Sequence, residues 1–77
     1  MRETAISSSE ALGSALRDAR RARGLRLEDV ALGAGVGIRF VSELERGKAT
    51  AQLGPALRVA QALGVTLVLT DPDAPDA

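Results

Sequence analysis

The chain has 77 residues, with ten basic and ten acidic side chains, a single aromatic residue, and neither cysteine nor histidine. A chain this short forms one small domain, and without cysteine or histidine it can hold neither disulfides nor the usual zinc-ligand sets. No apolar run approaches the roughly 20 residues of a membrane span, and the start lacks the apolar stretch of a signal peptide. We therefore expect a soluble cytoplasmic domain with a core of leucine, valine and alanine.

The net charge of zero conceals an uneven distribution. Asp71, Asp73 and Asp76 lie in the last seven residues, so residues 1–70 carry ten basic and seven acidic groups, a charge of +3. This excess is small for a nucleic-acid-binding protein, so such a function must rest on where individual cations lie. The arginines of the first helical segment fit a solvated helix face as well as a binding surface.

The first predicted helix follows a polar segment, residues 1–8, that we expect to be flexible. Ser9 is a suitable N-cap, and apolar residues then recur at helical spacing up to about Arg23: Leu12, Ala15, Leu16 and Ala19. Gly24 ends this helix, after arginines have placed positive charge at its negative end. A second helix is predicted over residues 27–34, with acidic residues in its first turn.

Three glycines surround the turn that follows: Gly33, Gly35 and Gly37. Their spacing matches neither a P-loop nor a dinucleotide fingerprint, and no strand precedes them, so a tight turn between two helices is preferred. The next helix is short, because Gly37 is its N-cap and Gly47 ends it. Its apolar edge consists only of Val41 and Leu44, so most of the helix surface is expected to face solvent.

That outward surface carries the most distinctive chemistry of the chain: Ile38, Arg39, Ser42, Glu43 and Arg46. A short helix with a thin apolar edge and this polar face is typical of the recognition helix of a helix-turn-helix, with DNA as its target. An enzyme is not expected, because there is no histidine or cysteine, no acid pair in an apolar setting, and no base near Ser42 in the sequence. We expect no catalytic residue, no metal and no cofactor.

The last helix is predicted over residues 55–63, with Gly54 as N-cap and Pro55 at its first position. Residues 65–70 then alternate apolar and threonine side chains, which predicts a strand. A lone strand needs a partner for its backbone, and we expect the same segment of a second copy to supply it, through Val65, Leu67, Val68 and Leu69. An edge segment packed on the helices is the alternative. Residues 71–77 are acidic and proline-rich, and we expect them to be disordered.

These elements predict an all-α fold, a small helical bundle with a helix-turn-helix over residues 9–64, plus one C-terminal β-strand that pairs in a dimer. From Leu25 to Lys48 the sequence resembles the Xre-type helix-turn-helix family of phage repressors and bacterial regulators. The resemblance is carried by Ala31, Gly35, Val36 and the run Leu44-Glu-Arg-Gly-Lys48. It extends over roughly residues 10–65 and implies a lambda-repressor-like fold and sequence-specific binding to operator DNA.

The stretch from Val36 to Lys48 and the strand after the last helix are more narrowly similar to the HipB-like antitoxins. This resemblance implies a homodimer held partly by its C-terminal strands, which represses its own operon and binds a HipA-like serine/threonine kinase toxin. It also implies a cytoplasmic, nucleoid-associated location. A stand-alone Xre-type regulator without a toxin is the alternative, and a protein-interaction module that does not use DNA is a third.

The resemblance also implies roles for single residues. The base-contacting positions fall on Ile38, Arg39, Ser42 and Glu43. Arg39 can bind guanine bidentately, and Glu43 either accepts a hydrogen bond from cytosine or orients Arg39. Arg46 and Lys48 match phosphate-contacting positions.

Phe40 and Arg26 are further candidates for DNA contact, although packing over the turn between the second and third helices is preferred for Phe40. Arg20 and Glu45 match a buried ion pair of phage-repressor relatives and are therefore assigned to the scaffold. Two polar clamps common in relatives are missing, because Leu27 stands where many have glutamine and a glycine caps the third helix.

Overall fold

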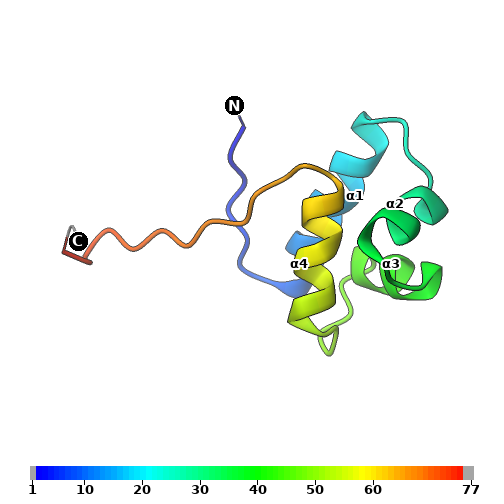
Figure 1. Ribbon diagram of the computed structural model, residues 1–77. Helices are drawn as coiled ribbons and strands as arrows, with labels where there is room; N and C mark the ends of the chain where they lie inside the picture. The colour runs from blue at the N-terminus through cyan, green and yellow to red at the C-terminus, as the bar shows by residue number, and fades with distance from the viewer. Residues whose placement is uncertain (1, 76–77) are drawn as a thin grey trace.

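The computed structural model describes residues 2–75 and consists of four helices (Figure 1). They are α1 (Ser9–Ala22), α2 (Leu27–Ala34), α3 (Ile38–Glu45) and α4 (Leu53–Ala62). The helix α2 packs on both α3 and α4, and α1 packs on α3. The predicted all-α fold with a helix-turn-helix is confirmed. Met1 of the predicted flexible N-terminus, and Asp76 and Ala77 of the predicted acidic tail, lie outside the described residues.

The core is made of leucine, valine and alanine. One valine from each of three helices is fully buried: Val30 of α2, Val41 of α3 and Val59 of α4. Leu16 anchors α1 to the same cluster. Since an aliphatic core this small removes little surface from water, the chain depends on close helix contacts for its stability. None of the helices in the described part of the chain is long and apolar enough to cross a membrane.

All four helices end in the same hydrogen-bond pattern around a glycine. Four glycines have positive φ angles between 67° and 85°: Gly24, Gly35, Gly47 and Gly64. The residue after each donates its N–H to the carbonyl five positions back: Leu25 to Arg20, Val36 to Ala31, Lys48 to Glu43, and Val65 to Ala60. In this Schellman arrangement the residue after the glycine usually makes an apolar contact. In three helices it is indeed apolar and packs against the core, whereas after α3 it is Lys48.

The starts of two helices differ from the prediction. The N-cap of α1 is Ser8 rather than Ser9, and its Oγ accepts a hydrogen bond of 3.0 Å from the N–H three residues on. With several serines in succession, the sequence does not distinguish between these caps. The helix α4 begins at Leu53 with Gln52 as its N-cap, so Pro55 is its third residue rather than its first. The first N–H groups of a helix have no intrahelical acceptor, so proline is accommodated there.

The predicted strand over residues 65–70 is not formed in the single chain. Val65 is half-buried against the helices, and beyond it the backbone leaves the bundle without regular secondary structure (Figure 1). Leu67, Val68 and Leu69 are 41%, 76% and 95% exposed. Within the described residues the backbone of 66–70 makes no backbone hydrogen bond. The physical reason is that a single chain offers this segment no strand edge with which to pair.

Candidate nucleic-acid interface

The outer face of α3 brings together the side chains predicted to contact bases. The helix buries Val41 and Leu44 between its neighbours and turns its other side to solvent. The Arg39 side chain is 91% exposed and Ile38 is 50% exposed. Ser42 and Glu43 are half-buried beside them. The helix therefore presents one long cation and one apolar side chain at the front of a polar surface.

Two glycines shape the turn that leads into this face. Gly35 has a φ of 69°, a left-handed conformation in which an L side chain is strained. Gly37 is the N-cap of α3, as predicted, and makes no side-chain capping bond. Between them Val36 packs against the core and fixes the start of α3 to the bundle.

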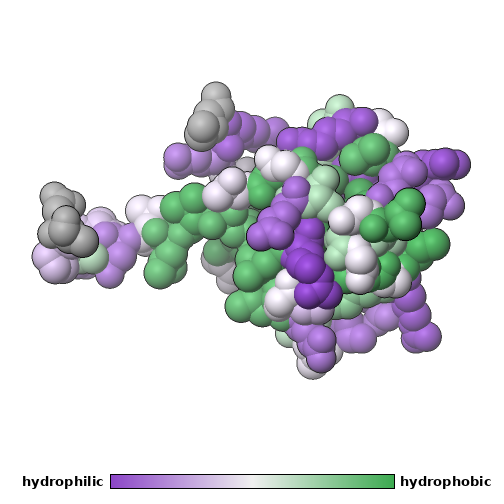
Figure 2. Space-filling view, in the orientation of Figure 1, coloured by the Kyte–Doolittle hydropathy of each residue, from purple (hydrophilic) through white to green (hydrophobic). Residues whose placement is uncertain are grey.

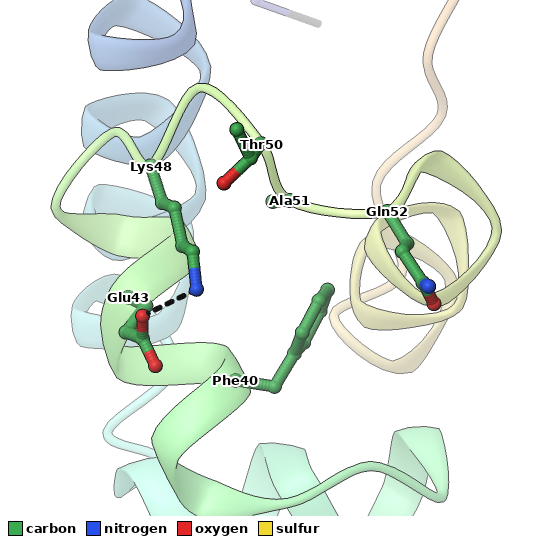
Figure 3. A pocket seen from close by; sticks show the side chains of 6 residues that line it. All are labelled: Phe40, Glu43, Lys48, Thr50, Ala51 and Gln52. Carbon is green, nitrogen blue, oxygen red and sulfur yellow. Dashed lines mark hydrogen bonds and ion pairs between the residues drawn. The ribbon is translucent and has the colours of Figure 1, made fainter.

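The carboxylate of Glu43 binds two cations at once. Its Oε1 accepts a hydrogen bond from Arg39 Nε at 3.0 Å, and its Oε2 accepts one from Lys48 Nζ at 2.7 Å, the contact drawn in Figure 3. The hydrogen bond from Lys48, helped by the nearby Arg39, lowers the pKa of Glu43 below its ordinary value. The contacts therefore keep the carboxylate charged to a lower pH than an isolated glutamate, and they are lost as the pH falls through that lowered pKa.

The ring of Phe40 lines a hollow that it shares with Glu43 and Lys48 of the exposed face. Figure 3 shows its ring directed into a shallow hollow between α3 and the connection to α4, where Thr50, Ala51 and Gln52 also lie. The ring packs against the core, as preferred from the sequence. Its position differs from the one predicted over the α2–α3 turn. The reason is that the connection to α4 leaves an open hollow beside α3, where an apolar ring gains burial.

The remaining predicted cations lie at helix ends. Arg46 is the exposed C-cap of α3. Arg26 is the N-cap of α2, and its guanidinium pairs with Glu28 and Asp29 at 3.3 Å and 3.6 Å, so part of its charge is compensated. Leu27 packs against the core. Many relatives have a glutamine at this position, so a position that is polar in those relatives contributes to packing in this chain. Residues 2–75 contain no group of three or more potential ligands that could hold a metal ion.

Behind the exposed face, Arg20 and Glu45 form a two-pronged ion pair. Arg20 Nε donates to Glu45 Oε2 at 2.8 Å, and Nη2 donates to Oε1 at 3.0 Å. Arg20 Nη1 also donates to the carbonyl of Leu25 at 2.9 Å. The side chains are only 13% and 6% exposed, and the hydrogen bonds to Glu45 raise the pKa of Arg20 above its ordinary value. The pair therefore ties α1 and the α1–α2 turn to the end of α3.

The sequence analysis did not identify Gly13, the residue that sets the depth of α3. A Cβ at Gly13 would overlap the carbonyl oxygen of Leu44 and lie 2.7 Å from that of Glu45. A Cβ at Gly47 would lie 2.8 Å from the Cα of Glu10. The backbone of α1 therefore touches the end of α3 at Gly13 and the turn after α3 at Gly47. The available signal was a glycine inside an otherwise regular helical pattern, where glycine is normally unfavourable.

Comparison with known proteins agrees with this geometry. A model of the helix-turn-helix family matches residues 16–69. The "uncharacterized HTH-type transcriptional regulator" y4mF of Sinorhizobium fredii is 40% identical over 67 residues, which cover 87% of this chain and 88% of y4mF. The restriction-modification controller protein C.AhdI of Aeromonas hydrophila is 33% identical, with a TM-score of 0.69, over 75% of this chain and 88% of C.AhdI.

Structures of HipB share the fold more completely. HipB in its complex with the O4 20mer superimposes with a TM-score of 0.84 over 92% of this chain and 100% of HipB. A HipA–HipB–O2–O3 complex gives the same TM-score and coverage. The sequence identity in both cases is 21%, so this similarity concerns the course of the backbone.

Proposed function

Because this chain belongs to the Xre-type helix-turn-helix family of DNA-binding transcriptional regulators, we propose that it is a repressor that reads operator DNA with α3. The observation that carries the proposal is the exposed face of α3. Arg39 extends from it with 91% of its side chain exposed, while the opposite edge of the same helix is buried. An α-helix with this division fits the major groove, where each base pair presents a distinct pattern of donors and acceptors.

The roles on this face follow from the chemistry of each side chain. The two Nη groups of Arg39 hydrogen-bond to no described residue, and they can donate together to O6 and N7 of a guanine. Ile38 is suited to a thymine methyl group, and Ser42 to a polar base edge. Arg46 and Lys48, at the end of the helix, are assigned to phosphates, which position a protein on DNA without reading its sequence.

Replacing Arg39 by alanine should reduce discrimination at one base pair by about 1–3 kcal/mol, because the bidentate contact to guanine is lost. Replacing Lys48 by alanine should instead weaken binding to all duplexes and lower the salt slope by about one for each bound protomer. Both are measured by fluorescence anisotropy on a duplex selected from a random pool, at several salt concentrations. Arg17→Ala, an exposed arginine of α1, is the control. Equal discrimination by Arg39→Ala and the unaltered chain would contradict the assignment.

We further propose that the repressor is the HipB-like antitoxin of a type II toxin–antitoxin pair. It would act in the cytoplasm at the nucleoid, repress its own operon, and bind a HipA-like kinase toxin. The fold shared with HipB over the whole HipB chain supports this, as does the presence of HipA in one of the similar complexes. A stand-alone regulator is the second candidate, favoured by the higher sequence identity to a controller protein and to a transcriptional regulator.

A tagged copy expressed in the native host distinguishes these two functions. An antitoxin should retain a kinase-like protein in stoichiometric amount, identified by mass spectrometry after purification. Retention of DNA without such a protein would exclude the toxin partner and leave the stand-alone regulator. A copy with Arg39→Ala serves as the control, since its reduced preference for operator DNA should leave a protein partner in place.

The functional unit is proposed to be a homodimer in which the C-terminal segments pair. Figure 2 shows an apolar stretch leading out of the bundle along this segment. Three consecutive apolar side chains there, Leu67, Val68 and Leu69, are exposed in the single chain. Pairing with a second copy would satisfy the backbone of this segment and cover these side chains. A dimer would also present two α3 helices to half-sites about one helical turn of DNA apart.

Deleting residues 66–77 should convert the dimer to a monomer, because the pairing segment is removed while Val65 stays packed on the bundle. Deleting only residues 71–77 should leave the dimer intact and is the matched control. Sedimentation equilibrium, with both variants at the same protein concentration, measures their oligomeric states. If the shorter chain still sediments as a dimer, the interface lies on the helices instead.

A further inference from the structure

The carboxylate of Glu43 lies between the residue proposed to read a base and a residue proposed to hold a phosphate. Arg39 precedes it by one helical turn, and their side chains meet at 3.0 Å. Lys48 reaches it from the other side, across the glycine that ends α3. The backbone holds this second contact in place, because the N–H of Lys48 donates to the carbonyl of Glu43 at 3.1 Å. The position of Lys48 is therefore fixed by the main chain as well as by its ammonium group.

This arrangement departs from the rule that the other helices follow. After α1, α2 and α4 the corresponding residue is apolar and packs against the core. An apolar residue after α3 would serve packing in the same way. The pairs that Glu43 makes contribute little to stability, since the Arg39 and Lys48 side chains are 91% and 47% exposed and therefore screened by water and salt. Folding alone therefore does not account for a lysine and an acid at these positions.

We propose that Glu43 is a positioning residue that makes DNA binding selective, an inference that rests on the proposed function. By accepting a hydrogen bond from Arg39 Nε, it leaves the two Nη groups as parallel donors, which is the arrangement that O6 and N7 of guanine require. By binding Lys48 Nζ, it links this contact to one phosphate-binding position. One carboxylate thereby couples the base contact and the phosphate contact of α3.

The charge of Glu43 has a second consequence. On a duplex without guanine at the Arg39 position, the oriented guanidinium gains no bidentate contact. The carboxylate then remains close to the DNA phosphates, and like charges repel. Glu43 therefore repels the phosphates of every duplex, and only on the matching duplex does the bidentate contact that it supports offset this repulsion. Specificity arises from this difference, in which an unfavourable contact with the wrong partner counts as much as a favourable one with the right partner.

Three variants separate orientation from charge. Glu43→Gln removes the charge and cannot accept hydrogen bonds from two cations in the same way. Glu43→Asp keeps the charge, but its shorter side chain cannot reach both cations. Asp18→Asn, at an exposed position of α1, removes one negative charge away from the proposed interface. All three should unfold at the temperature of the unaltered chain, which shows that binding differences do not come from misfolding.

Each variant is titrated against three duplexes at about 0.1 M salt: the selected operator, the operator with the guanine at the Arg39 position replaced by adenine, and a random sequence. Glu43→Gln should bind the random duplex about five- to tenfold more tightly for each bound protomer, as expected for one less repelled charge. It should also discriminate against the adenine duplex about tenfold less. Glu43→Asp should lose the discrimination without the gain on random DNA, and Asp18→Asn should change neither.

The outcomes separate this inference from the function on which it rests. If the unaltered chain binds the operator selectively and Glu43→Gln keeps the full discrimination, the positioning role is overturned and the repressor function stands. If the unaltered chain shows no selectivity for any duplex, the proposed function fails and the inference fails with it. If Asp18→Asn reproduces the effect of Glu43→Gln, overall charge accounts for the result and the positioning role is again overturned.

Discussion

Replacing Glu45 by alanine should lower the free energy of unfolding by about 3–5 kcal/mol, because it leaves the Arg20 guanidinium buried without its carboxylate. The two side chains are 13% and 6% exposed, so water cannot fully replace the lost partner. The guanidinium does not escape this cost by losing its proton, because arginine stays protonated in proteins. Domains of this size have a total stability of about 4–12 kcal/mol, so the variant approaches the limit of folding. Thermal and urea denaturation followed by circular dichroism measure the loss.

The double variant Arg20→Met with Glu45→Leu is the matched control. It removes both charges together and replaces them with apolar side chains of similar size, which in comparable cases is close to neutral or stabilising. Its stability should return to within about 1 kcal/mol of the unaltered chain. A single Glu45→Ala variant that unfolds like the unaltered chain would show that the pair is not desolvated in solution.

Replacing Gly13 by alanine should destabilise the chain by about 2–3 kcal/mol, the cost of an extra methyl group in a packed interior. The new Cβ would lie 2.7 Å from the carbonyl oxygen of Glu45 and 2.9 Å from its carbonyl carbon, and these are backbone atoms that cannot rotate away. To relieve the overlap, α1 and α3 must separate, which also stretches the Arg20–Glu45 pair. Urea denaturation gives the change in the free energy of unfolding.

Gly33→Ala is the matched control for this experiment. Gly33 also lies inside a helix, but a Cβ there would meet only the Ala62 Cβ at an ordinary 3.6 Å. Alanine is favoured over glycine in a helix, so this variant should be stabilised by about 0.5–1 kcal/mol. The two substitutions should therefore have opposite signs. A gain in stability from both would mean that α1 and α3 do not approach as closely as the structure indicates.

Both Gly13 and the Arg20–Glu45 pair contact α3 on its buried side, where it packs against α1. They fix how deeply the helix sits and how it is tilted, while the exposed face determines what it contacts. Variants at these positions should therefore reduce binding to all duplexes together, through loss of the folded state. Variants of Arg39 should instead alter the preference among duplexes. This contrast allows stability effects to be separated from recognition effects in the same binding measurements.

The helices were predictable because their signals are local. An apolar stripe repeats along α1, and the glycines at the helix ends have no Cβ to oppose a positive φ, so the sequence alone indicated where α1, α2 and α3 stop. The outward face of α3 was predictable for the same reason, since Val41 and Leu44 leave only one edge for burial. The Arg20–Glu45 pair joins positions 25 residues apart, and it was reached only through resemblance to known repressors.

The sequence by itself thus determined the number and order of the helices, the composition of the core and the polar face of α3, because each depends on neighbouring residues. Only the tertiary structure decided how the helices meet. It assigned Gly13 to a backbone contact, turned Phe40 toward the connection to α4, and joined Arg39 and Lys48 through Glu43. Within the described part of the chain it also left residues 66–70 without a backbone hydrogen-bond partner. The Gly13 contact joins segments remote in the sequence, and the Lys48 contact depends on the turn after α3. A strand edge exists only when a second chain provides it.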